Sequence, residues 1–344
     1  MKVALATHQA TAILRGGPRT QVLQTAEELG RLGHQVRLFD AFTQVRRGDF
    51  DLVHIFGAGM GTYHLARALH LQQIPIVVTP IYLTRRPPWL VRLLTSAEQL
   101  VRTAYPAFWT DYAMISEMCA WAAIVAPNTQ EEAKLFHEAF QVPAEKLAVI
   151  PNGVEDRFGN VGPQAFIESH RMKDFVLSVG HIAPARKNVM RLVEALEGID
   201  RPAVIIGRVE ETREAKAVLD RSRQNPRLVI LEHVDHESNL LPSAYAACDT
   251  FVLPSLFETP GIAALEAGLA GAKVVITPHG GPREYFGDHA EYVNPYSVND
   301  IRRGIQAALD RPKDTSLSTH IAGRYLWRHV AERTAEVYAS LPPR

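Results

Sequence analysis

Short apolar runs alternate with helical stretches along almost the whole chain, and this alternation constrains the fold more than any other feature. Buried parallel strands read as such continuous apolar runs, and the helices between them connect parallel neighbours. The sequence therefore predicts an α/β fold whose parallel sheets are covered by helices on both faces. In the first part of the chain the expected strands are 2–7, 35–40, 51–57, 74–79, 122–128 and 146–154.

The alternation is interrupted once, over residues 155–172, where the chain loses its periodicity and gains Gly, Pro and Asn. We expect a domain boundary there, and a length of 344 residues suits two domains. The expected domains are 1–160 and 170–318, with a final helix within 319–344. The second set of expected strands is 175–180, 203–207, 227–234, 249–255, 273–278 and 290–295.

Composition excludes several classes of function. The 37 basic and 37 acidic residues cancel, so no overall charge attracts nucleic acid. Cys119 and Cys248 are the only cysteines, which excludes a disulfide framework and favours a reducing compartment. The N-terminus lacks the apolar run of a signal peptide, and no stretch approaches the roughly 18 apolar residues of a membrane span. We expect a cytoplasmic protein, with attachment to the inner face of a membrane left open.

The stretch PSLFETPGIAALEAGLAG (254–271) combines a strand end, a Thr-Pro-Gly turn and an Ala-rich helix. Proline suits the first helical position, and Gly261 allows a ligand to approach the backbone. The amides of Gly261 and Ile262 would then face outward at the positive end of the helix dipole. Such a helix start is suited to bind phosphate.

Two glutamates flank this helix start. Glu258 lies in the loop, beside any group carried by the phosphate, and Glu266 lies inside the helix. A carboxylate so deep in an Ala-rich helix needs a partner, and the vicinal hydroxyls of a ribose would be a natural one. The alternative is an ordinary helix N-terminus with acidic residues near its positive end.

Two further segments have the composition of phosphate-binding loops. In SVGHIAPARKNV (178–189), Arg186 and Lys187 follow a strand and could meet a diphosphate, although a solvated pair is the alternative. Gly16 and Gly17 follow the first strand and leave backbone amides accessible, although turn geometry alone also explains them.

No cofactor or metal site is expected. The loop GAGMG (57–61) fails the G-x-G-x-x-G spacing of an NAD site and is interpreted as a cleft loop. The 14 histidines have no metal-binding spacing.

A basic, aromatic segment contains Arg85, Arg86, Trp89, Arg92 and Arg102. It could hold a lipid-diphosphate acceptor or an anionic membrane surface. The alternative is an amphipathic helix with a solvated arginine face.

Together these motifs resemble the retaining glycosyltransferases of family 4, also described as glycosyl transferases group 1. The resemblance rests on residues 254–275, on HGGPREY (279–285), VIPNGV (149–154) and RLGHQV (31–36), which occur in the family's order. It covers nearly the whole chain, from Gly16 to about residue 338. It implies the GT-B fold, in which two Rossmann-like domains face each other and a C-terminal helix crosses back to the first.

The resemblance implies roles for the donor-site residues. Glu258 would contact the transferred sugar, Glu266 would hold the ribose, and the amides of Gly261 and Ile262 would hold the distal phosphate and sugar. Lys187 first, and Arg186 second, would bind the diphosphate. Gly16 and Gly17 would approach the donor phosphate from the first domain, and Gly207 and Val234 would border the nucleobase.

The chain also departs from the family pattern. His181 stands where the family usually has Arg, and His233 stands where it often has Gly. The acceptor-side His after the 74–79 strand is missing, so Tyr82 is the candidate there. With Arg85 and Arg86 it forms our expected acceptor site.

The implied function is metal-independent transfer of a hexose, with retention, from a UDP- or GDP-linked sugar to a glycan or lipid-linked acceptor. The common setting of the family is cell-envelope polysaccharide or glycolipid synthesis. One alternative is an epimerase or hydrolase of the same fold, which would turn over donor without acceptor. Another is a non-catalytic, sugar-nucleotide-binding partner subunit, which would bind donor and transfer nothing.

Overall fold

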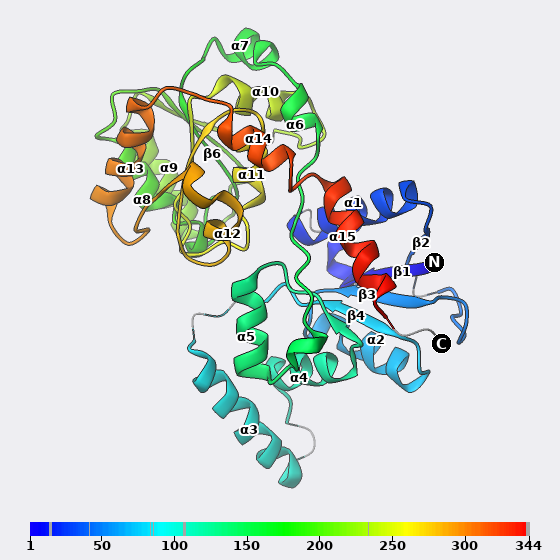
Figure 1. Ribbon diagram of the computed structural model, residues 1–344. Coiled ribbons are helices and arrows are strands. Elements are labelled where there is room, and N and C mark those ends of the chain that lie inside the picture. The colour runs from blue at the N-terminus through cyan, green and yellow to red at the C-terminus, as the bar shows by residue number, and fades with distance from the viewer. Residues whose placement is uncertain are drawn as a thin grey trace. The chain divides into compact units, whose positions relative to one another are not determined.

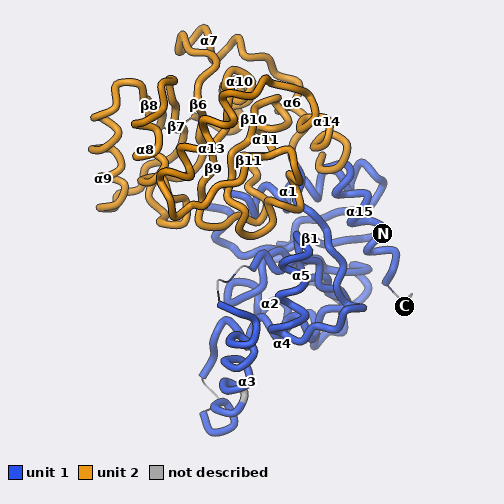
Figure 2. Tube along the Cα trace, turned by 60° about the vertical axis from the view of Figure 1, so that its left-hand side comes forward, with its two compact units in different colours: residues 1–153, 327–344 blue, residues 154–326 orange. Residues whose placement is uncertain are grey.

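The computed structural model describes residues 1–13, 16–40, 42–82, 84, 86–105, 108–232 and 234–341. The chain divides into two compact units (Figure 2). Unit 1 comprises Met1–Gly153 and Trp327–Arg344, and unit 2 comprises Val154–Leu326. The division therefore falls just before the aperiodic segment 155–172, and the chain returns to unit 1 after residue 326 rather than at 319.

Unit 1 is built on a five-stranded parallel sheet in the order β2-β1-β3-β4-β5 (Figure 1). Its strands are β1 (Lys2–Thr7), β2 (Gln35–Leu38), β3 (Leu52–Phe56), β4 (Ile76–Thr79) and β5 (Ile124–Val125). Its helices are α1 (Gly17–Arg31), α2 (Met60–Leu71), α3 (Pro88–Ala104), α4 (Asp111–Trp121), α5 (Gln130–Phe140) and α15 (Trp327–Ala339), with short 3-10 turns η1 (Gln9–Ala12) and η2 (Ala144–Lys146).

Successive side chains of each strand point to opposite faces of this sheet, as the period of a β-strand requires, and both faces are buried. Val3 and Leu5 pack in one apolar cluster with residues of α1 and α15. Ala4 and Ala6 pack in the other, with residues of α2, α4 and α5. Burial on both faces explains why the strands read as unbroken apolar runs.

The expected strand at 146–154 is wrong. Residues 147–150 lie beside β5 and make only two backbone hydrogen bonds to that segment. Ala148 N donates to Val125 O, and Ile150 N donates to Pro127 O. Pro127 and Pro151 have no N–H to donate, so the ladder cannot extend beyond this short contact. The segment leads the chain into unit 2 instead.

The C-terminal helix α15 is part of unit 1. Trp327 and Val330 are buried in a cluster with Val22 and Leu29 of α1. Near the other end of α15, the Tyr338 hydroxyl lies 2.7 Å from Nδ1 of His54, a buried residue of β3. Among the described residues, no helix is long and apolar enough to cross a membrane.

Unit 2 is built on a six-stranded parallel sheet in the order β11-β10-β9-β6-β7-β8. Its strands are β6 (Val176–Val179), β7 (Ala203–Ile206), β8 (Leu228–Leu231), β9 (Thr250–Leu253), β10 (Lys273–Ile276) and β11 (Ala290–Tyr292). Its helices are α6 (Arg157–Asn160), α7 (Gln164–His170), α8 (Val189–Leu196), α9 (Arg213–Ser222), α10 (Leu240–Ala247), α11 (Ile262–Leu269), α12 (Pro282–Phe286), α13 (Val298–Asp310) and α14 (Ser316–Ala322), with turns η3 (Ala185–Lys187) and η4 (Gly287–His289).

The strand order of unit 2 reverses between β6 and β9. From β6 the chain builds outward through β7 and β8, and it then returns to place β9 on the other side of β6. In open α/β sheets, ligands bind outside the carboxyl ends of the strands at such a switch point. The loops that follow β6 and β9 are therefore the first place to look for a site in unit 2.

Candidate functional site

The loops after β6 and β9 are bound to each other. Leu256 N donates to Arg186 O at 2.8 Å, and the Arg186 guanidinium donates back to Phe257 O at 3.1 Å. The two loops therefore form one structure, which carries the predicted Arg-Lys pair and the predicted glutamate.

Asn188 holds the end of this structure in place. It is buried, and its side-chain amide donates to Pro254 O at 2.9 Å and to Pro295 O at 2.7 Å. Its φ of 57° is in the left-handed region, which Asn tolerates better than most residues. Asn188 is not among the residues predicted from the sequence, although its position directly after Lys187 was an available signal.

Glu258 lies at the centre of the site. Its side chain is 7% exposed, and its two oxygens lie 2.7 Å from Lys187 Nζ and 3.2 Å from Arg186 Nη1. Burial alone raises the pKa of the Glu258 carboxyl, but the charges of Lys187 and Arg186 outweigh it and leave the pKa below its ordinary value. Three predicted site residues thus form one ionised cluster at the switch point.

The glycine turn of HGGPREY supports the backbone of Glu258. Glu258 N donates to His279 O, and Gly281 N donates to Glu258 O at 2.9 Å. Gly280 has a φ of +91°, and a Cβ there would lie 2.1 Å from Glu258 O. Only glycine fits this close contact without displacing the loop.

The N-terminus of α11 follows in the same loop. Gly261 is its N-cap, with a φ of +81°, and Ala264 N makes the first intrahelical bond, to Gly261 O. The amides of Gly261 and Ile262 precede that bond, where a helix has no backbone acceptors for them. This arrangement suits an anionic group.

Glu266 has a separate set of partners. It is buried within α11, where the Tyr245 hydroxyl donates to Oε2 at 2.8 Å and His236 Nε2 lies 3.2 Å from Oε1. Arg157 Nη2 lies 3.1 Å from Nδ1 of His236 and donates to its carbonyl at 2.8 Å. The hydrogen bond to Glu266 raises the pKa of His236, and burial raises that of Tyr245.

The sequence indicated that Glu266 needs a partner but did not identify Tyr245, His236 or Arg157. These residues come from α10, the loop before it and α6, so no local spacing connects them. Their geometry fixes the orientation of the Glu266 carboxylate in the folded unit.

The remaining predicted residues of unit 2 lie around these two carboxylates. Gly207 directly follows β7, and a Cβ there would lie 1.9 Å from Gly180 O after β6. Val234 is half-buried against the apolar cluster that contains Tyr245. His181, which replaces the family's Arg, lies 3.6 Å from Glu210. The cations at Glu258 are therefore Lys187 and Arg186.

The predicted glycines of unit 1 lie at the start of α1. Gly16 is the N-cap, with Thr20 N donating to its carbonyl, and Gly17 begins the helix. The predicted residues Arg85 and His233 lie outside the described residues.

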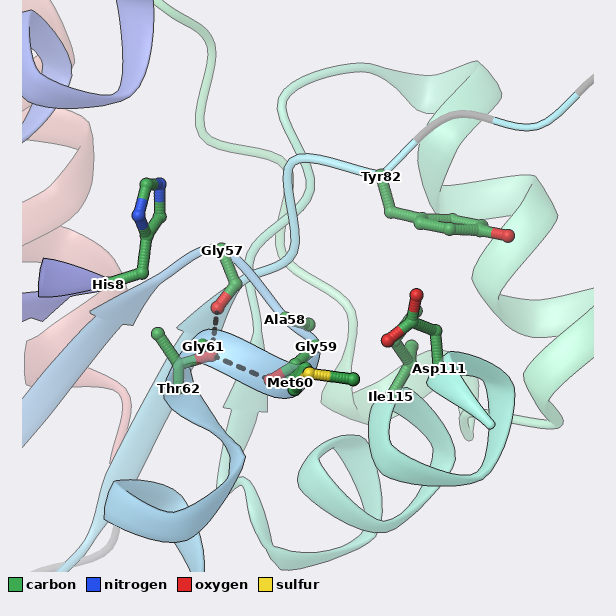
Figure 3. A pocket seen from close by; sticks show the side chains of 10 residues that line it. All are labelled: His8, Gly57, Ala58, Gly59, Met60, Gly61, Thr62, Tyr82, Asp111 and Ile115. Carbon is green, nitrogen blue, oxygen red and sulfur yellow. Dashed lines mark hydrogen bonds between the residues drawn. The ribbon is translucent and has the colours of Figure 1, made fainter. Parts of the chain in front are cut away.

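Unit 1 contains a cavity of about 310 Å³ at its own switch point, between the loops after β1, β3 and β4. Figure 3 shows His8 on one side and Tyr82 and Asp111 on the other, with the loop of residues 57–62 between them. A Cβ on Gly61 would lie 2.8 Å from the His8 Cβ, so glycine permits this close approach. The loop GAGMG, interpreted as a cleft loop, lines the cavity.

The predicted acceptor residues divide between two places. Tyr82 lines the cavity, and burial raises the pKa of its hydroxyl. Arg86 is not among the lining residues and donates to the Tyr112 hydroxyl at 2.8 Å. Asp111, which the sequence analysis missed, adds an exposed carboxylate to the cavity. No three His, Cys, Asp or Glu side chains gather to hold a metal ion in the described ranges.

Two family models match successive parts of the chain. The model "Glycosyltransferase Family 4" matches residues 40–158, and the model "Glycosyl transferases group 1" matches residues 164–321. The second match includes both carboxylates of the unit 2 site.

Curated relatives match more distantly. An uncharacterized glycosyltransferase of Methanocaldococcus jannaschii is 25% identical over 66% of this chain and 62% of its own length. O-antigen chain mannosyltransferase B of Escherichia coli is 28% identical over 48% of this chain and 46% of its own length. The chain thus spans less than two thirds of each of these relatives.

Solved structures match over the full chain. Sucrose-phosphate synthase of Thermosynechococcus elongatus superposes with a TM-score of 0.76 at 18% identity, covering 99% of each chain. HepE of Anabaena, solved in complex with UDP and glucose, gives a TM-score of 0.73 at 17% identity, covering 99% of this chain and 100% of that one. At these identities the likeness establishes the fold.

Proposed function

Because the chain belongs to the glycosyltransferases, with a family 4 domain before a group 1 domain and the GT-B fold, we propose that it is a retaining hexosyltransferase. It takes the hexose from a nucleoside diphosphate sugar and transfers it to a hydroxyl of a glycan or lipid-linked acceptor. Unit 2 binds the donor.

The ionised cluster of Glu258, Lys187 and Arg186 carries this proposal. When the bond from the sugar to the distal phosphate breaks, negative charge grows on the departing diphosphate. Fixed cations stabilise that charge and lower the barrier. Lys187 and Arg186 stand at the switch point, next to a helix start suited to phosphate, and so supply this charge.

The carboxylates hold the two ends of the donor. The low pKa of Glu258 keeps it ionised, so it accepts hydrogen bonds from the hydroxyls of the transferred hexose. Glu266, oriented by Tyr245 and His236, accepts hydrogen bonds from the ribose. The amides of Gly261 and Ile262 hold the distal phosphate.

Transfer with retention places the acceptor on the face of the sugar from which the diphosphate leaves. The acceptor oxygen forms the new bond to the anomeric carbon as the bond to phosphate breaks. The acceptor proton passes to the departing phosphate oxygen. No step in this sequence requires a metal ion.

The cavity of unit 1 is the proposed acceptor site. The Asp111 carboxylate lies across the glycine loop from His8, and the Tyr82 ring lies on the same side as Asp111 with its hydroxyl directed away from His8 (Figure 3). Such a set donates and accepts hydrogen bonds, as a polyhydroxyl acceptor requires.

The relatives support transfer over the alternatives. The E. coli relative is named as an O-antigen chain mannosyltransferase, which supports a role in envelope polysaccharide synthesis. The Anabaena structure contains UDP and glucose, which supports a UDP-linked donor. An epimerase, a hydrolase and a non-catalytic subunit have no comparable support among these proteins.

The test is the stereochemistry of transfer. Proton NMR would monitor the anomeric configuration of the product formed from UDP- and GDP-hexoses with a set of hydroxyl acceptors. We expect an anomer with the configuration of the donor, unchanged by a metal chelator. Lys187→Ala should lower kcat about 10²–10³-fold, as the loss of one charge-stabilising group does elsewhere. Arg223→Ala, which removes an exposed cation at the C-cap of α9, should leave kcat unchanged. An inverted product, or donor turnover without transfer, would refute the proposal.

A further inference from the structure

Helix α3 of unit 1 buries polar side chains and exposes apolar ones, which is the reverse of an ordinary surface helix. Its most buried side chains are Val91, Thr95 and Glu98. Thr95 donates to Val91 O, and the Glu98 carboxylate accepts from Thr110 N at 2.6 Å. Of these three buried side chains, among those that the structure describes on α3, two are therefore polar.

The opposite face of α3 is apolar and open. Trp89, Leu93 and Leu100 are 66%, 57% and 74% exposed. At about 100° per residue these three lie within about 40° of one another and roughly opposite Glu98. A solvated arginine face, the alternative weighed from the sequence, is not what this helix presents.

The exposed apolar surface continues past the helix. Nearly half of the large apolar side chains that are exposed in the described residues lie between Trp89 and Trp109. Among them are Tyr105 at 71% and Phe108 at 48% exposure. Figures 1 and 2 both show α3 projecting from the rest of unit 1. A concentrated, protruding apolar surface indicates an interaction site.

The charges around this surface decide which partner it fits. Between residues 88 and 109 the sequence contains one carboxylate, Glu98, which is buried and hydrogen-bonded. Arg92 flanks the apolar face, and Arg86, which is exposed and also donates to the Tyr112 hydroxyl, precedes the helix. Exposed Trp and Tyr beside arginines are typical of segments that lie in the interface of an anionic membrane.

We propose that the face formed by Trp89, Leu93 and Leu100 docks unit 1 onto an anionic lipid bilayer, with Arg86 and Arg92 contacting the headgroups. The helix lies in the plane of the interface and inserts these three side chains. The proposal does not depend on the chemistry of the site in unit 2.

The test is flotation of the full chain with vesicles of phosphatidylcholine alone or mixed with phosphatidylglycerol. We expect binding to the mixed vesicles, weakened by salt. A variant with Trp89, Leu93 and Leu100 all changed to Ser should bind more than about tenfold more weakly. Changing Arg86 to Gln should cost about fivefold in affinity, and only on anionic vesicles.

A control variant carries Leu38→Ser, Phe42→Ser and Leu71→Ser, which remove exposed apolar side chains elsewhere in unit 1. It should bind like the parent chain. Brominated lipid should quench the fluorescence of the parent, and Trp89→Phe should lose most of that quenching. Equal binding by the parent, the α3 variant and the control would overturn the proposal. So would a dimer in sedimentation that the α3 variant abolishes, in a chain that binds no vesicles.

Discussion

Lys187 Nζ lies 2.7 Å from Glu258 Oε1, so a buried carboxylate and the cation proposed for the leaving group neutralise each other before any donor binds. The pair joins the loop after β6 to the loop after β9 at the switch point of unit 2. A bound diphosphate would share the lysine with the glutamate. With two cations and one carboxylate in the cluster, we propose that the site is preorganised for a negative charge that arrives with the substrate.

Replacing Lys187 should make the stability of unit 2 less sensitive to acid. The folded pKa of Glu258 lies below its ordinary 4.5, so its ionised form stabilises the fold above that pH, and this is lost as the pH falls through the folded pKa. In Lys187→Ala the Glu258 carboxylate keeps Arg186 as a partner. We therefore expect the free energy of unfolding to fall by about 2 kcal/mol at neutral pH. Urea unfolding against pH should show a smaller acid transition in this variant than in the parent chain, because losing the Lys187 charge raises the folded pKa of Glu258 toward its unfolded value. In Glu258→Gln that transition should be absent, and an unchanged acid transition in Lys187→Ala would refute the coupling.

The pair of His236 and Glu266 predicts a pH effect of opposite sign. The hydrogen bond to Glu266 raises the folded pKa of His236 above 6.5, so its contribution is present below pH 6.5 and is lost as the pH rises through the folded pKa. Donor-free thermal unfolding should therefore show a stability decrease in that range. His236→Asn should lack it. Identical pH profiles for the two chains would contradict the assignment.

His54 predicts that acid weakens unit 1. It is buried between Tyr338 and Thr79, and burial lowers its pKa to about 3. Below pH 6.5 His54 binds a proton in the unfolded chain, but it stays neutral in the folded unit. Stability should therefore fall by about 1.4 kcal/mol per pH unit below 6.5 until the folded group titrates. His54→Gln should lack this slope, and an equal slope would exclude His54 as its cause.

Tyr338→Phe tests the attachment of the C-terminal helix separately. The change leaves Nδ1 of His54 without its partner on α15. The free energy of unfolding should fall by about 1–3 kcal/mol, as it does for other buried polar groups left unpaired. Proteolysis should then release the C-terminal segment before the rest of unit 1 unfolds. Unaltered stability and protease resistance would show that this hydrogen bond does not hold α15.

Two glycines with the same backbone angle separate strain from function. Gly280 and Gly271 have φ of +91° and +90°, but only Gly280 lies against Glu258 O, and nothing lies within 4 Å of a Cβ on Gly271. Gly271→Ala should lose about 1 kcal/mol of stability and keep full activity. Gly280→Ala should lose more stability and at least about tenfold in kcat/KM for the donor, because the Glu258 loop must shift. Equal kcat/KM in the two variants would exclude a role for this contact.

The sequence predicted the two-domain α/β architecture because buried parallel strands leave continuous apolar runs. It failed at 146–154, where an apolar run with a proline reads as a strand but can pair only over two bonds. Local patterns cannot show whether a neighbouring strand has N–H groups to offer.

The site was predictable only where its residues lie in short motifs. Glu258, Gly261 and Glu266 occur in one turn and helix, and Arg186 and Lys187 are adjacent. Asn188 was within reach of the same reasoning. Tyr245, His236 and Arg157 were not, because folding brings them to Glu266 from three separate segments.

The most direct test of the donor site is the thermal unfolding of the chain with UDP, GDP, ADP or NAD. A ligand that binds only the folded state raises the unfolding temperature by mass action. We predict that one nucleoside diphosphate stabilises the parent chain, that NAD does not, and that Glu266→Ala and Lys187→Ala lose most of the shift while Arg223→Ala keeps it. Stabilisation by NAD alone, or a nucleoside diphosphate shift that survives both site variants, would contradict the account.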